Sequence, residues 1–136
     1  MTYAVSSALQ SAVFGAVSGN LALQALIGAD VFDQPPSGVL PLTYVVVGEE
    51  NVQPRSDISA NGAVHDLTIS VFSDAAGFTA AKDVAVTISD ALVDVPLTLA
   101  RGRLVSMSFL RARAKRGKAP DGRRIDLTFR ARVEDI

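Results

Sequence analysis

The final part of the chain alternates apolar and polar side chains with a strict period of two. Over residues 123–133, RRIDLTFRARV, one set of alternate positions is apolar, and the other is polar and rich in arginine. Successive side chains of a strand point to opposite faces, so one set faces a core and the other faces away from it. The core set is Ile125, Leu127, Phe129, Ala131 and Val133, and the outward set is Arg124, Asp126, Thr128, Arg130 and Arg132.

A partner strand is predicted over residues 103–115, because the GKAPDG that follows contains a Pro-Asp-Gly turn signal. At every second position of this strand the first side chains are apolar, as expected for a face that packs on the core, and the last ones are basic. Either the strand extends past the core, or a bulge near Leu110 shifts its phase. Both alternatives predict a long cationic hairpin at the edge of the molecule. The positions that share this phase are Val105, Met107, Phe109, Arg111 and Arg113.

The middle of the chain predicts two further strands and one helix. Residues 43–48 are a β-branched run typical of a buried strand, whereas residues 49–62 lack an apolar period and predict a long loop. From Val64 the period of two returns, and it becomes helical after Asp74, which we expect to cap a helix that Pro96 closes. The core positions are Leu67, Ile69 and Val71 in the strand, and Phe78, Ala81, Ala85, Ile88 and Leu92 in the helix.

Residues 1–29 contain no charged side chain, which raises the alternatives of a secretory signal and a membrane span. Polar residues interrupt this segment and no Lys or Arg precedes it, so neither alternative is favoured and no membrane contact is expected. Helical spacing instead predicts two short helices, the second capped by Asn20 and ended by Gly28. The stripe of the first helix is Val5, Leu9, Ala12, Val13, Ala16 and Val17.

These elements predict an α+β fold formed by a single domain over residues 1–136. Two N-terminal helices and one central helix are expected to pack on a mixed, largely antiparallel sheet that ends in a long C-terminal β-hairpin. The composition, 49% apolar and 20% charged, suits a chain with a proper core.

The net charge of −1 conceals a strong asymmetry. Residues 1–100 contain two bases, Arg55 and Lys82, against ten acids, whereas residues 101–136 contain eleven bases against four acids. A chain this dipolar can attract nucleic acid through its basic end, or it can attract further copies of itself.

No residue pattern indicates catalysis, a cofactor or a metal. His65 stands beside Asp66, but neighbouring strand residues point to opposite faces and no activated nucleophile accompanies them. Glu49, Glu50 and Asp57 lack the spacing of a calcium loop, GKAPDG lacks the ending of a phosphate-binding loop, and there is no cysteine. A small cytosolic enzyme with an unrecognised site is the least favoured of three function classes.

The arginine-rich hairpin leaves the other two classes, a module that binds DNA nonspecifically and a protein that assembles. No Tyr or Trp lies among the arginines to stack on bases, which disfavours sequence-specific or single-strand binding. A basic hairpin and an acidic remainder suit repeated head-to-tail contacts, and such contacts close into a ring when the rotation permits.

Four segments in order carry a resemblance over nearly the whole chain: DQPPSGVLPLTYVVVGEE, RSD, HDLTISVFSDAAGFTAAKDVAVTISDAL and PLTLARGRLVSMSFLRARA. The chain resembles the tail-completion, or tail terminator, proteins of long-tailed phages and of alphaproteobacterial gene transfer agents. Related sequences often have tryptophan before the serine of the strand-to-helix junction, where this chain has Phe72 before Ser73.

The resemblance implies a structural virion protein in the tail and neck of a phage-like particle assembled in the bacterial cytoplasm. It implies a homo-hexameric ring that caps the head-proximal end of the tail tube, stops tube polymerisation and joins the tail to the capsid. The implied partners are further copies of the chain, the tail tube protein and the neck, or head-completion (stopper), protein. DNA would pass through the channel without specific binding. The family supplies no catalytic residues.

We expect the interface residues to come from the hairpin and from the predicted loop. The hairpin arginines would meet acids of a neighbouring subunit or ring, and the loop would become ordered on assembly. An alternative places some of the arginines on the channel wall. The predicted residues are Arg111, Arg113, Arg130 and Arg132 in the hairpin, and Glu49, Glu50, Arg55 and Asp57 in the loop.

Overall fold

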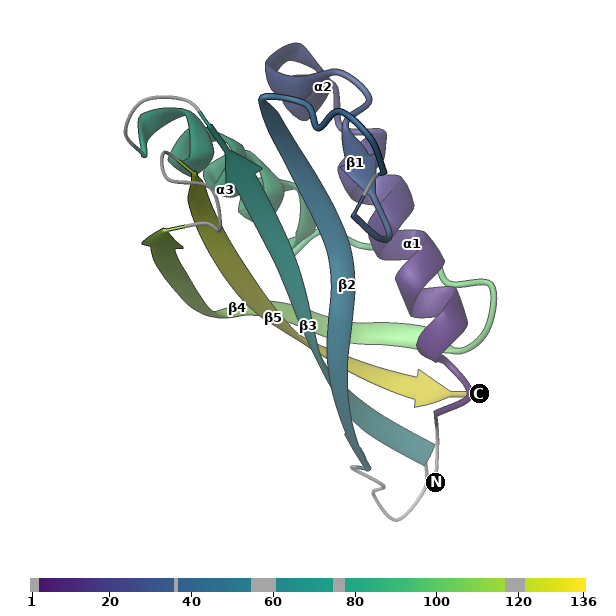
Figure 1. The fold of residues 1–136 in the computed structure, drawn as a ribbon. Helices are drawn as coiled ribbons and strands as arrows, with labels where there is room; N and C mark the ends of the chain where they lie inside the picture. Colours follow the sequence, from purple (N-terminus) through teal and green to yellow (C-terminus); the bar gives the residue numbers. More distant parts are fainter. Residues whose placement is uncertain (1–2, 36, 55–60, 75–77, 117–121) are drawn as a thin grey trace.

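A computed structural model describes residues 3–35, 37–54, 61–74, 78–116 and 122–136. Five strands form one sheet in the order β1-β2-β3-β5-β4, in which only β1 and β2 are parallel, and the helices pack on one of its faces (Figure 1). The predicted α+β fold with a C-terminal hairpin is confirmed. In chain order the elements are α1 Ser6–Ser18, α2 Leu21–Ile27, β1 Val31–Phe32, β2 Thr43–Pro54, β3 Asn61–Ser73, α3 Thr79–Leu92, β4 Arg103–Arg116 and β5 Arg123–Asp135.

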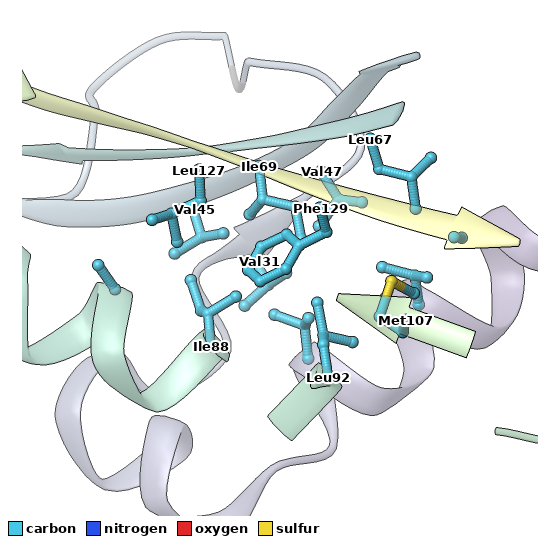
Figure 2. Close-up of a cluster of buried hydrophobic side chains, with 14 of the residues drawn as sticks. Val31, Val45, Val47, Leu67, Ile69, Ile88, Leu92, Met107, Leu127 and Phe129 are labelled. Atoms are coloured by element: carbon cyan, nitrogen blue, oxygen red, sulfur yellow. The ribbon is translucent and has the colours of Figure 1, made fainter. Parts of the chain in front are cut away.

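The core lies between the sheet and the helices, and it uses the side chains that the alternation selects. Figure 2 shows side chains of β2, β3 and β5 pointing toward Ile88 and Leu92 of α3. All five core positions predicted for the last strand are buried, and Phe129 has no exposed surface. Burying this many apolar side chains is the main favourable contribution to folding.

The two N-terminal helices form as their sequence predicts. In α1, Leu9, Val13 and Val17 are buried on the predicted stripe. At the start of α2 the side chain of Asn20 accepts a hydrogen bond from the backbone N–H of Leu23 at 3.0 Å, and Gly28 follows the helix with φ of 63°. The described part of the chain contains no helix that is long and apolar enough to span a membrane.

Of the two alternatives for this strand, β4 contains the bulge near Leu110. Its pairing with β5 shifts between Phe109 and Arg111, and shifts again between Leu104 and Ser106. Phe109 therefore pairs with Phe129 on the helix side, whereas Arg111 falls on the opposite face. The core phase of Phe109 is correct, but its side chain is 48% exposed because β4 is the outermost strand.

The long loop predicted over residues 49–62 is wrong at both ends. Strand β2 continues to Pro54, and β3 begins at Asn61. A bulge between Val47 and Glu50 interrupts the two-residue alternation, so the sequence shows no period where the strand nevertheless continues. Residues 55–60 of the predicted loop lie outside the described residues.

The predicted helix cap at Asp74 is also wrong. Helix α3 begins at Thr79, and Phe78 occupies the cap position without a side-chain hydrogen bond. The backbone N–H of Asp74 instead donates to the carbonyl oxygen of Leu42 at 2.9 Å, so Asp74 extends the contact between β3 and the start of β2. The predicted stripe is otherwise correct, with Ala81, Ala85, Ile88 and Leu92 buried.

The bulge in β2 directs Glu50 toward the amino end of α1. The hydroxyls of Tyr3 and Ser6 each donate to Oε1 of Glu50 at 2.6 Å, and Nδ1 of the fully buried His65 lies 3.3 Å from Oε2. A carboxylate at this end of a helix also interacts favourably with the helix dipole. Burial alone would raise the pKa of Glu50, but the hydrogen bonds from Ser6, Tyr3 and His65 outweigh it and hold the pKa below its ordinary value.

The first prediction concerns Gly102, which has φ of 70° just before β4. A Cβ here would overlap the carbonyl oxygen of Glu134 and approach a methyl of Val5 to 3.0 Å. We expect Gly102→Ala to lower the free energy of unfolding by about 3 kcal/mol, from strain and overpacking together. Gly38 is the control, because it also has positive φ, 83°, but no atoms within 4 Å of a built Cβ. Gly38→Ala should cost only about 1 kcal/mol by urea unfolding; equal costs would contradict the proposed clash.

The second prediction concerns the attachment of α1 by Glu50. Glu50→Gln should lower the free energy of unfolding by about 1–3 kcal/mol at pH 7, because a neutral amide oxygen accepts the hydrogen bonds of Tyr3 and Ser6 less strongly than a carboxylate does. A depressed pKa stabilises the fold above the unfolded value, ordinarily 4.5, and this contribution disappears as pH falls through the lower folded value. The difference between wild type and Glu50→Gln should therefore shrink in urea titrations below pH 4.5. The exposed neighbour provides the control, and Glu49→Gln should change stability by less than about 0.5 kcal/mol. A cost that persists undiminished in acid would refute this account.

Candidate protein interface

The sheet face opposite the helices gathers all four arginines predicted in the hairpin. Across the strands, Arg130 pairs with Asp66 on one side and Ser108 on the other, and Arg132 pairs with Val64 and Ser106. The bulge at Leu110 brings Arg111 and Arg113 to this same face, opposite Thr128 and Asp126. We call this surface the open face. It is formed by the outward side chains of β2, β3, β5 and β4.

Arg130 is already paired within its own chain. Its guanidinium donates to both carboxylate oxygens of Asp66, at 2.8 and 3.0 Å. These hydrogen bonds lower the pKa of Asp66 against the opposing effect of burial, and the positive charges of Arg130 and Arg111 lower it further. A solvent-exposed pair of this kind, in which one guanidinium bonds both oxygens of a carboxylate, adds modestly to the stability of the fold and fixes the direction of the arginine side chain.

Arg111 and Arg113 differ from Arg130, because both are exposed and neither has a carboxylate within 4.0 Å in the described ranges. Arg132 has an interaction within the chain. Of the four predicted arginines, Arg111 and Arg113 are therefore the two that are exposed and form no ion pair in the described ranges.

The loop residues predicted for the interface do not stay together. Glu50 points to the helix side and holds α1, whereas Glu49 is exposed and does not share its contacts. Arg55 and Asp57 lie outside the described residues. The bulge in β2 separates the two glutamates, since it turns consecutive side chains in different directions.

Sequence reasoning missed the acid that organises the end of the open face near the hairpin turn. Asp126 accepts hydrogen bonds from Ser70 at 2.7 Å and from Arg124 at 2.8 Å, and Nζ of Lys115 lies 3.3 Å from its second oxygen. Burial would raise the pKa of Asp126, but these partners lower it. The alternation had placed Asp126 among the outward arginines. This outward position is the only sign in the sequence that Asp126 contributes to the open face, because the sequence does not show how β5 aligns with β3.

An open hollow of about 890 Å³ lies on the open face beside the start of β2. Two stacked aromatic rings and an arginine line this hollow. The ring centroids of Tyr44 and Phe72 are 4.9 Å apart, and the guanidinium carbon of Arg124 lies 5.0 Å from the centroid of the Phe72 ring. Aromatic rings stacked with arginine suit protein contact, because they combine apolar area with directed charge.

The geometry offers nothing to support catalysis by His65. His65 is buried on the helix side, while Asp66 is bound to Arg130 on the open face, as the alternation predicts. In the ranges that the structure describes, no group of three or more His, Asp or Glu side chains is placed to hold a metal ion.

Comparison with known proteins assigns the family. No curated protein matches the chain. The family model of the tail completion protein gp17 matches residues 11–134. A solved chain from the virion of a native gene transfer agent particle is 53% identical, with a TM-score of 0.92 over 98% of this chain and 99% of that one. Since the family model covers nearly all of the sequence, and a solved structure shares both its sequence and its fold, the chain belongs to the tail completion protein gp17 family.

Proposed function

We propose that this chain is a tail terminator, a ring of six copies on the head-proximal end of a tail tube. The ring stops polymerisation of the tube and joins the tail to the neck of a phage-like particle. Its partners are further copies of itself, the tail tube protein and the neck (stopper) protein, and DNA passes through its channel without specific binding. It acts as one domain, by assembly and not by catalysis, and it is assembled in the bacterial cytoplasm.

The full-length similarity to a chain from a gene transfer agent virion is the observation that carries this proposal. The charge distribution supports it independently. Residues 101–136, which include the hairpin, contain eleven bases against four acids, while residues 1–100 contain two bases against ten acids. Unlike surfaces on one chain attract each other between copies, which favours a head-to-tail arrangement.

We assign the interface first to Arg111 and Arg113, which would pair with acids of a neighbouring copy or ring. Arg130 and Arg132 form the inner part of the same surface. Glu49 contributes from β2, which β3 and β5 separate from β4, and Arg55 and Asp57, which lie outside the described residues, would add to it. Glu50 acts indirectly, by holding α1 against β2.

Deletion of the gene in particle-producing cells is the primary test of the terminator function. Without the ring the tube has no stop and no attachment to the head, so negative-stain electron microscopy should show overlong or headless tails. Complementation with the wild-type gene is the control. Tails of normal length on filled heads would reject the proposed function.

Charge reversal tests the arginine assignment. Arg111→Glu with Arg113→Glu should reduce ring formation or head–tail joining at least tenfold, which corresponds to about 1.4 kcal/mol. The melting temperature should stay nearly constant, because both side chains are exposed. Lys82→Glu is a matched control, an exposed charge reversal on α3. Normal assembly by the double variant would refute the assignment.

A second candidate function is nonspecific DNA contact through the open face, favoured by the arginines that gather there away from the helices. In this case the double variant would assemble normally and would alter DNA passage. Retention of the wild-type protein on DNA would fall steeply with salt, because phosphate contacts release counterions.

A further inference from the structure

The two outer edges of the sheet are chemically different. Strand β4 forms one edge, and within the described part of the chain its one strand partner is β5. At the other edge β1 has only two residues and pairs with Val45 and Val46 of β2. The connection between β1 and β2 runs along this second edge (Figure 1). The order β1-β2-β3-β5-β4 keeps the two edges apart within one chain.

The connection from β1 to β2 presents apolar side chains to solvent. Val39 is 99% exposed, Leu42 is 64% exposed and Leu40 is 49% exposed. We call these three residues the apolar arm. Exposed apolar side chains grouped in this way commonly mark an interaction site.

Acidic side chains accompany the apolar arm. Asp33, Glu49 and Asp74 line the same open hollow as Leu40 and Leu42, and the bases that line it come from the other strands, at Lys115, Arg116, Arg123 and Arg124. Within the described ranges, none of these three carboxylates has a base within 4.0 Å. The apolar arm therefore lies near three carboxylates that form no ion pair in the described ranges.

The β4 edge offers the complementary combination. After Met107 every side chain of β4 is at least partly exposed, and Phe109, Ala112 and Ala114 lie on the helix side without full cover. Arg111 and Arg113 lie beside them on the open face, without carboxylate partners in the described ranges. The backbone N–H of Asp94 donates to the carbonyl oxygen of Met107 at 3.5 Å, and beyond Met107 no described strand pairs with the outer backbone of β4. Folded proteins rarely leave such an edge uncovered.

We propose that the apolar arm of one copy packs against the β4 edge of the next copy, with Asp33 and Glu49 facing Arg111 and Arg113. This inference rests on the proposed ring and names its subunit contact. Charge selects the pairing, because arm against arm would oppose acids and β4 against β4 would oppose arginines. Since the two surfaces differ, the contact is heterologous, and it closes into a ring when the rotation permits.

The natural sequence has no cysteine, so introduced thiols give an unambiguous test. Particles are prepared with a chain that carries Val39→Cys and Ala112→Cys, treated with a short bismaleimide and separated on a denaturing gel. The expected result is a covalent ladder that extends to the full ring. Each single variant should give only monomer, and a mixture of the two single variants should stop at dimer. The pair Leu42→Cys and Phe109→Cys repeats the test with independent positions.

Two outcomes would overturn the inference, and they have different meanings. Normal particles without a ladder from either cysteine pair, or linkage of Val39→Cys to itself, would place the contact elsewhere and leave the proposed function standing. Particles of normal tail length that lack the chain entirely would reject the proposed function and this contact with it.

A charge variant provides a second measurement. Val39→Arg should reduce incorporation of the chain into particles at least tenfold, because it brings a base to the arginines of β4. Val86→Arg is the matched control, since Val86 is 58% exposed on α3 and lies on neither edge. Both variants should keep the circular dichroism and melting temperature of the wild type. Equal incorporation of Val39→Arg and Val86→Arg would contradict the contact.

Discussion

The continuous antiparallel pairing of β3 with β5 is the interaction on which the rest of the molecule depends. It runs without a register shift from Asn61 opposite Asp135 to Ser73 opposite Arg123. Because both strands keep a strict alternation, one face of this ribbon supplies Ile69 and Phe129 to the core, while the other carries the Asp66–Arg130 pair. Side chains on the two faces are thus fixed by the same backbone hydrogen bonds, and fold and surface cannot be changed independently.

The outer strands β2 and β4 adapt to this rigid centre through bulges. The bulge after Val47 turns a carboxylate toward the helices, where Glu50 holds the start of α1. The bulge after Phe109 has the opposite effect, because it turns the following arginines from the helix side to the open face. Bulges of this kind redirect side chains without ending the sheet, and here they determine which charges are structural and which remain available for contact.

Sequence reasoning succeeded where the period is uninterrupted and failed where tertiary structure decides. The alternation of β5, the stripe of α3 and the Asn20 cap were predicted because each is a local pattern with a local cause. The length of β2 was missed because Gly48 and Glu49 break the period, and continuation depends on β3 as a partner. The alternation of β4 also assigned Phe109 to the correct face of the sheet. It cannot reveal that the helices cover β4 only in part. The four arginines were found by position, whereas the pairing of Arg130 with a residue 64 positions away required the register.

The unlike edges give each copy a direction within the plane of its sheet. Any open chain of copies joined through the proposed contact has one uncovered apolar arm at one end and one uncovered β4 edge at the other, whatever its length. A closed ring is the only finite assembly in which every arm and every strand is covered. Growth would therefore be self-limiting laterally, and the copy number would follow from the angle between neighbours, with no separate factor needed to count them.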